Sequence, residues 1–121
     1  MTPEIKRGDI YYANLNPVVG SEQGDRRPCI VVQNDTGNHH SPTVVIVPLT
    51  GKAKKHYLPT HVVIPQSCGL ETSSMALAEQ LRTIDRSRLG SYVGRIGTSE
   101  QTAIDKAIAI SLGLSVKEVA A

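Results

Sequence analysis

The sequence predicts a mainly β (α+β) protein, a small and strongly bent β-barrel or sheet followed by one C-terminal α-helix. Short apolar runs bounded by turn-forming residues recur along most of the chain, and a helical apolar pattern follows near its end. Hydrophobic residues make up 40% of the 121 residues, with no Phe and no Trp. The core is therefore expected to be aliphatic and β-branched, a composition typical of strands.

Five apolar runs have the length of strands. They cover residues 9–15, 29–33, 43–50, 60–65 and 92–96. Residues 34–38 are rich in turn formers and are expected to form a loop. Residues 75–84 are ambiguous, because their first half favours a helix by propensity while their alternation permits a long strand. We predict a strand there, followed by a helical turn over 85–89 that Asp85 caps.

The last element is an amphipathic helix packed on the sheet. Thr98 and Gln101 have the spacing of a capping box, and apolar residues recur at helical intervals from Ala103 until Gly113 ends the pattern. Successive short strands with one terminal helix indicate an SH3-like β-barrel with a C-terminal α-helix. At this length we expect residues 1–121 to form a single domain.

A polar loop at residues 18–28 lies between the first two predicted strands. Glycines near both ends permit unusual backbone angles, and binding groups concentrate in loops that a rigid sheet supports. A solvated hairpin loop is the alternative interpretation. The loop carries more hydrogen-bonding and charged side chains than a plain connection needs, namely Ser21, Glu22, Gln23, Asp25, Arg26 and Arg27.

The net charge of +2 and the pI of about 8.6 are far below those of proteins that wrap duplex nucleic acid. A polyanionic partner is therefore expected to meet a local patch. The densest basic run is at residues 52–55, close to Tyr57, where phosphate contacts with a stacked base compete with a solvated loop as interpretations.

No metal site is predicted. His39 and His40 are adjacent, but neighbours in sequence seldom face one ion and no third ligand is evident. Cys29 and Cys68 lack metal-ligand spacing and are expected to be reduced thiols, Cys29 buried. Residues 1–7 contain no signal-peptide pattern and no run is long enough to span a membrane, so we expect a soluble, cytoplasmic protein without membrane association.

Several sequence blocks together resemble the MazF/PemK family of toxin endoribonucleases, and the pattern is most similar to the Gram-positive branch. The resemblance runs almost end to end. Its blocks are KRGDIY at 6–11, PVVGSEQG at 17–24, RP at 27–28, QND at 33–35, SPT at 41–43, LPTHV at 58–62 and EQLRTID at 79–85.

This resemblance implies an SH3-like barrel that forms a homodimer and is the toxin of a type II toxin–antitoxin pair. Members cut single-stranded RNA, including mRNA, at short sequences without a metal or other cofactor, and an antitoxin protein inhibits them by covering the same surface. The reaction uses the 2′-hydroxyl as nucleophile and leaves a 2′,3′-cyclic phosphate and a 5′-hydroxyl.

The resemblance also implies site residues. Arg27 matches the catalytic arginine, whose guanidinium suits phosphate better than it suits proton abstraction. Thr50 matches a threonine that faces this arginine in some members, and Glu22 matches an acidic catalytic position. Which of the three is base or acid stays open. The implied base readers and phosphate contacts are Ser21, Gln23, Glu79 and Gln80, with Arg7 and the run beginning at Lys52.

Two other classes of protein are alternatives. A toxin of the same fold that poisons DNA gyrase without catalysis carries a tryptophan near its C-terminus, whereas this chain has none. A peptide-binding SH3-like module lines its groove with aromatic residues, of which this chain has only four, all tyrosines. The ribonuclease therefore remains the main hypothesis from the sequence.

Overall fold

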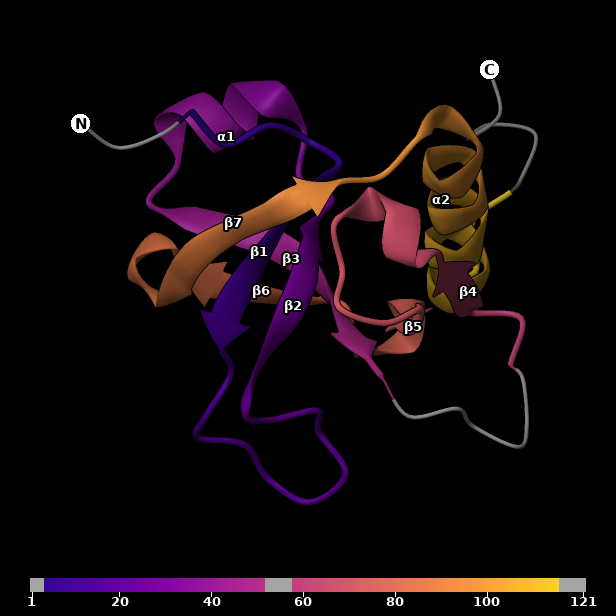
Figure 1. Cartoon of the computed structure of the whole chain (residues 1–121), viewed down its shortest axis with the longest axis horizontal. Helices are drawn as coiled ribbons and strands as arrows, with labels where there is room; N and C mark the ends of the chain where they lie inside the picture. Colours follow the sequence, from indigo (N-terminus) through magenta and orange to yellow (C-terminus); the bar gives the residue numbers. More distant parts are fainter. Residues whose placement is uncertain (1–3, 52–57, 116–121) are drawn as a thin grey trace.

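The computed structural model describes residues 4–51 and 58–115 and has a mainly β fold that ends in a helix (Figure 1). The fold class predicted from the sequence is confirmed. The strands are β1 (Asp9–Asn14), β2 (Arg26–Val31), β3 (Thr43–Thr50), β4 (His61–Ile64), β5 (Ser74–Leu77), β6 (Arg82–Asp85) and β7 (Leu89–Arg95). The helices are α1 (Asp35–His40) and α2 (Thr98–Leu112), with short 3₁₀ turns η1 (Gln66–Cys68), η2 (Ala78–Gln80) and η3 (Arg86–Arg88).

Strand β3 is the centre of the sheet because it changes partners along its length. The strand order is β4-β5-β3-β2-β1-β7, and β6 also pairs with β3. The first half of β3 pairs with β6, and Leu49 and Thr50 pair with β5. All pairs are antiparallel. The ladders between described residues do not join β6 to β7, so the sheet bends like a barrel without closing.

The core has two parts, one on each face of β2. Ile30 belongs to a cluster that also contains Ile104 of α2, whereas Cys29 and Val31 point into the interior of the bent sheet. Residues 29–31 of β2 are therefore buried on both faces, which explains the continuous apolar run there. Both cysteines are free and buried. Burial raises the pKa of the Cys29 thiol to about 12.

The prediction of one long strand over residues 75–84 was wrong. Strand β5 ends at Leu77 and β6 begins at Arg82, with the turn η2 between them. Met75 pairs with Thr50, whereas Arg82 pairs with Ile46 of the same strand β3. The chain has to leave one segment of β3 and return to another, so a turn interrupts a sequence whose alternation alone permits a continuous strand.

Other boundaries also differ from the sequence prediction. Residues 35–40 form the short helix α1, because the Asn34 side chain accepts a hydrogen bond from the backbone of Gly37 at 2.8 Å and caps its first turn. Strand β2 begins at Arg26 instead of Cys29, because its first residues pair with Asn14 and Ala13.

The terminal helix is confirmed, with a different cap. Gly97 takes the cap position, and Glu100 accepts from its backbone N–H at 2.8 Å, so Thr98 is the first helical residue. Gly113 ends the helix with φ of 72°, as the sequence indicates. The turn η3 is capped by Asp85, also as predicted.

Candidate functional site

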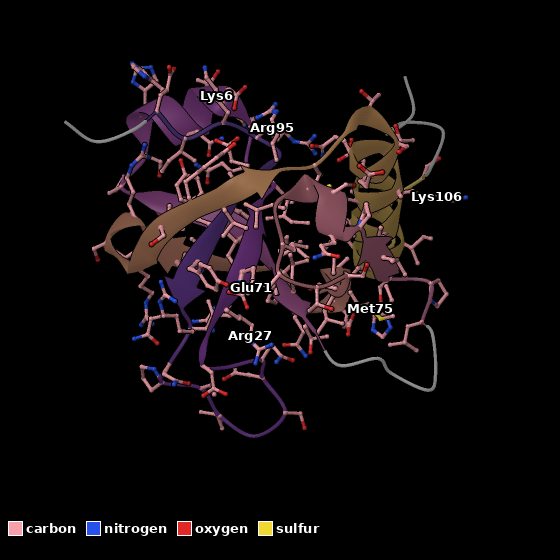
Figure 2. All side chains as sticks on the ribbon, in the orientation of Figure 1. Lys6, Arg27, Glu71, Met75, Arg95 and Lys106 are labelled. Carbon is pink, nitrogen blue, oxygen red and sulfur yellow. The ribbon has the colours of Figure 1, made fainter. Side chains whose placement is uncertain are left out.

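Arg27 lies at the open end of the interior face of the sheet. Cys29 and Val31 point into this interior, and side chains two residues apart on a strand share a face, so Arg27 begins on the same side. Its side chain is only 18% exposed. Figure 2 shows Arg27 where β2 meets the loop between β1 and β2.

The Arg27 guanidinium is held by the backbone of two different segments. Its Nε donates to the Gly24 carbonyl at 2.6 Å, and its Nη1 donates to the Leu49 carbonyl at 3.1 Å. The carboxylate of Asp25 lies 4.0 Å from Nη2. The group is thus oriented by contacts from both the loop and the end of β3.

The amide of Gln23 covers the outer edge of this guanidinium. An arginine carries only donors, so the amide atom facing it is the oxygen, which then accepts from both Nη1 and Nη2 at 2.7 Å. A phosphate or carboxylate can also contact these two N–H groups, with two oxygens in place of the one amide oxygen.

Thr50 ends β3 on the same interior face. Val44 and Ile46 point into the interior cluster, and Thr50 continues their alternation with 6% exposure. The β2–β3 ladder ends with Cys29 opposite Pro48, and the same register continued by two residues would bring Thr50 opposite Arg27. The contact of Arg27 with Leu49 fits this placement.

Glu22 lies in the exposed loop and faces its own backbone. Its carboxylate accepts from the Val19 N–H at 2.5 Å, and its N–H donates to the Val19 carbonyl at 3.2 Å. The described contacts therefore join Glu22 to Val19 and not to Arg27.

A concavity of about 360 Å³ lies between the loop and η2. Gln80 crosses it, because its side chain accepts from the Gln23 N–H at 3.2 Å and donates to the Ser21 carbonyl at 3.4 Å. Three of the residues that the sequence predicts as RNA contacts are thereby brought together. The lining residues are Glu22, Gln23, Glu79, Gln80, Leu81 and Arg82.

Glu79 is oriented within the concavity by two buried partners. Thr60 donates to one carboxylate oxygen at 2.8 Å, and Nε2 of His61 lies 3.0 Å from the other. Nδ1 of His61 accepts from the Leu58 N–H at 3.3 Å, which leaves Nε2 as the donor to Glu79. Burial raises the pKa of Glu79, but the hydrogen bonds from Thr60 and His61 outweigh it and hold the pKa below its usual value.

Family membership follows from a comparison of the whole chain. Residues 6–112 match the model of the PemK-like, MazF-like toxin of type II toxin–antitoxin system family. The chain belongs to this family. The resemblance found in the sequence blocks is thereby confirmed.

Solved structures of relatives are similar over nearly the whole chain. MazF from Deinococcus radiodurans has 27% identity and a TM-score of 0.82, with 93% of this chain and all of that chain covered. An endoribonuclease from a mycobacterial species, in complex with its cognate antitoxin, has 28% identity and a TM-score of 0.76, covering 92% and 97%. A MazE–MazF complex from D. radiodurans has 26% identity and a TM-score of 0.75, covering 94% and 100%.

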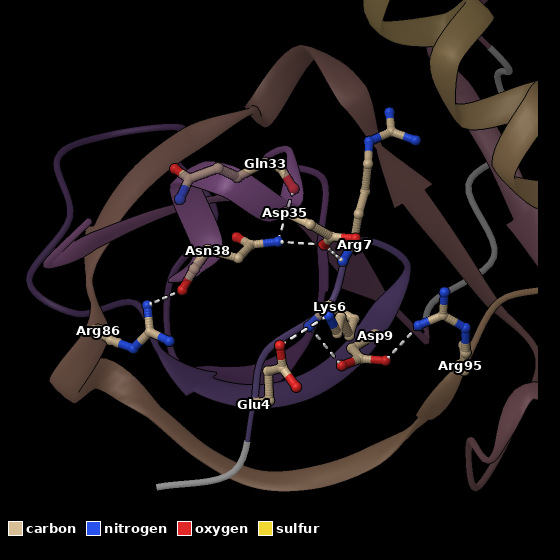
Figure 3. Close-up of polar contacts among 9 residues, drawn as sticks. All are labelled: Glu4, Lys6, Arg7, Asp9, Gln33, Asp35, Asn38, Arg86 and Arg95. Atoms are coloured by element: carbon tan, nitrogen blue, oxygen red, sulfur yellow. Dashed lines mark hydrogen bonds and ion pairs between the residues drawn. The ribbon is translucent and has the colours of Figure 1, made fainter. Parts of the chain in front are cut away.

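Arg7 is not part of the cluster around Arg27 in this MazF/PemK chain. It lies near the other end of β2, where its backbone donates to Asp35 (Figure 3). Its side chain contacts the Val32 carbonyl and Asp105. These contacts join the segment before β1 to α1 and α2. Lys52 lies outside the described residues. RNA contacts by Arg7 and Lys52 stay predictions.

Arg82 is a residue that sequence reasoning missed. Within the motif EQLRTID it counts only as part of the resemblance, yet the structure places it in the wall of the concavity. The available signal was its spacing, because it precedes the buried Ile84 by two residues on β6 and therefore shares its interior face.

His39 and His40 lie at the exposed end of α1 with their rings 4.5 Å apart. Nowhere in the described part of the chain do three His, Cys, Asp or Glu side chains gather as a metal ion would require. Within residues 4–51 and 58–115, no helix is long and apolar enough to cross a membrane.

Proposed function

We propose that this chain is the toxin of a type II toxin–antitoxin pair and acts as a sequence-specific, metal-independent endoribonuclease on single-stranded RNA such as mRNA. The observation that supports it best is the Arg27 guanidinium, fixed by the Gly24 and Leu49 carbonyls at an open edge beside Thr50. Membership of the toxin family and the likeness to a mycobacterial endoribonuclease agree with this function.

In the proposed reaction the 2′-oxygen attacks phosphorus while the bond to the 5′-oxygen breaks. The products are a 2′,3′-cyclic phosphate and a 5′-hydroxyl. A base accepts the proton of the 2′-hydroxyl, an acid returns one to the departing 5′-oxygen, and a cation stabilises the charge that grows on the phosphoryl oxygens.

Arg27 supplies the stabilising charge. Two carbonyls already orient its guanidinium, so little reorganisation is needed when charge develops on the phosphate. The Gln23 amide oxygen is an acceptor on the edge that a phosphate would use. Substrate binding then exchanges one acceptor for another, and Gln23 becomes free to contact a base.

We assign the proton transfers to Arg27, Thr50 and Glu22 as a set. Thr50 follows Leu49, whose carbonyl accepts from Arg27, and we assign its hydroxyl to donate to a phosphoryl oxygen or to pass a proton. Glu22 supplies the carboxylate of the loop. One of its carboxylate oxygens accepts from the Val19 N–H, and a carboxylate retains further acceptor sites to take a proton from the 2′-hydroxyl.

Base recognition is assigned to the concavity beside Arg27. Sequence-specific RNA proteins read the edges of splayed bases. Glu79 offers an ionised and oriented acceptor for a base amine, and Gln80 and Ser21 offer amide and hydroxyl groups next to the loop. Arg7 and Lys52 remain proposed contacts to more distant phosphates.

The proposed partners are a second copy of this chain and a cognate antitoxin. Relatives from D. radiodurans and a mycobacterial species have been solved with their antitoxins. We propose that the antitoxin covers the surface around Arg27 and the concavity, which would exclude RNA.

The test is incubation of the purified protein with a long single-stranded RNA in excess chelator, followed by mapping of the cuts and identification of the new ends. Recurring cuts with cyclic phosphate and 5′-hydroxyl ends, lost in Arg27→Ala, are expected. Activity abolished by the chelator would overturn metal independence. If the folded protein does not cut RNA, the assignment as a ribonuclease is overturned, and binding to DNA gyrase or to peptides becomes the favoured function.

A further inference from the structure

We propose that Arg82 is a second phosphate-binding residue, which holds the RNA backbone at the phosphate next to the one that Arg27 contacts. This inference rests on the proposed ribonuclease function and deepens it. It assigns a role to a side chain that the family resemblance marked only as part of a motif.

The first observation is where the Arg82 side chain ends. Arg82 starts on β6, opposite Ile46 of β3, and its Nη1 donates to the Leu15 carbonyl just past the end of β1 at 3.1 Å. The side chain therefore crosses the open end of the sheet from one side to the other. Leu15 is two residues from Ala13, the cross-strand partner of Arg27.

The second observation is that both arginines act on the same buried thiol. Cys29 lies inside the sheet, and the positive charges of Arg27 and Arg82 both favour its thiolate against the larger effect of burial. Both guanidinium groups are therefore close enough to the interior for their charges to act on Cys29.

The third observation concerns charge balance. Among the described residues, three arginines have a carboxylate within 4.0 Å, and four, Arg82 among them, have none. The paired ones are Arg7 with Asp105, Arg27 with Asp25 and Arg95 with Asp9. Of the two acids in the concavity, Glu22 accepts from Val19, and Glu79 is bound by Thr60 and His61.

These observations favour a phosphate as the group that meets Arg82. Its guanidinium keeps N–H donors beyond the one that Leu15 accepts, and it is half-buried in the wall of a concavity. A single strand carries a phosphate at every nucleotide, so a backbone fixed at Arg27 brings the next phosphate into reach. Arg82 binds the substrate there without entering the bond-breaking step.

The experiment measures binding of a single-stranded DNA oligonucleotide of the mapped cleavage sequence, which lacks the attacking 2′-hydroxyl, and of a scrambled oligonucleotide, over a range of salt concentrations. Wild type is compared with Arg82→Met and Arg82→Lys. The matched control is Arg88→Met, because Arg88 donates to the Asn14 carbonyl at 3.1 Å but does not line the concavity. Melting curves check the fold of each variant.

Arg82→Met is expected to weaken the binding of both oligonucleotides by a similar factor. It should also reduce the magnitude of the slope of log affinity against log salt concentration by about 0.7, the contribution of one phosphate of a single strand. Arg82→Lys should keep the slope, and so should Arg88→Met. Should Arg82→Met fail to fold, Arg82→Gln replaces it, since its amide keeps a hydrogen-bond donor without the positive charge.

An unchanged slope of log affinity against log salt concentration in a folded Arg82→Met protein would overturn the inference, but it would not affect the proposed ribonuclease function. Weakened binding of the cleavage sequence alone would also overturn it, because it would make Arg82 a base reader. A wild-type protein that neither binds nor cuts RNA would overturn the proposed function, and this inference with it.

Discussion

The Arg27 guanidinium donates to the carbonyl of Leu49 at 3.1 Å, so the residue before Thr50 orients the proposed catalytic arginine. This contact joins the first residues of β2 to the last residues of β3. It makes the site depend on the β2–β3 register, because a slip by one residue would move Arg27 to the other face of the sheet.

Replacement of Arg27 by lysine tests the need for a planar guanidinium. One ammonium cannot contact the Gly24 and Leu49 carbonyls and a phosphate as the arginine does, so Arg27→Lys should lower the cleavage rate by about 100-fold. The matched control is Arg26→Lys, because Arg26 stacks on the Tyr12 ring at 4.4 Å on the opposite face. Equal rates for wild type and Arg27→Lys would remove Arg27 from the mechanism.

Substitution of Gln23 by glutamate should weaken RNA binding. A carboxylate at this position would pair with Nη1 and Nη2 more strongly than the amide and would compete with phosphate for the same edge. Binding of the oligonucleotide should fall by about tenfold or more, most strongly at low salt. The exposed Gln66 provides the control substitution Gln66→Glu, and identical binding by both variants would contradict the contact.

Acid unfolding should report the contacts of Glu79. Its pKa in the folded protein lies below the usual value of 4.5, because the bonds from Thr60 and His61 outweigh the opposing effect of burial. A lowered carboxylate pKa stabilises the fold above the unfolded pKa, and this contribution disappears as pH falls through the folded pKa. The stability lost by Glu79→Gln at pH 7 should therefore shrink towards pH 3.

Thermal unfolding at several pH values measures this difference between wild type and Glu79→Gln. The control is Glu71→Gln, since Glu71 is exposed and does not line the concavity. A stability gap that stays constant from pH 7 to pH 3 would show that the Glu79 hydrogen bonds do not favour its ionised form.

An alanine at Gly94 should destabilise the fold. A Cβ there would lie 1.8 Å from the carbonyl oxygen of Cys68, where η1 packs against β7. Because the backbone has to move, the free energy of unfolding should fall by about 1–3 kcal/mol or more in chemical denaturation. The matched substitution Gly51→Ala, whose nearest neighbour would be Thr72 at 3.5 Å, should cost much less. Equal costs would contradict this packing.

Some features of the fold were readable from the sequence because they depend on local patterns. The continuous apolar run in β2 reflects burial on both faces, Gly113 ends α2, and Asp85 caps η3. The interruption at η2 was not readable, because it follows from the return of the chain to a different segment of β3.

The sequence by itself determined the fold class, the family and the polar loop that carries Arg27, because alternation, caps and motifs are properties of neighbouring residues. Only the tertiary structure decided which distant groups meet. Glu79 is hydrogen-bonded to His61, 18 residues away in the sequence, and Arg82 is hydrogen-bonded to Leu15, 67 residues away. Such contacts depend on strand register and on the bend of the sheet, which pair segments far apart in the chain and leave no local trace.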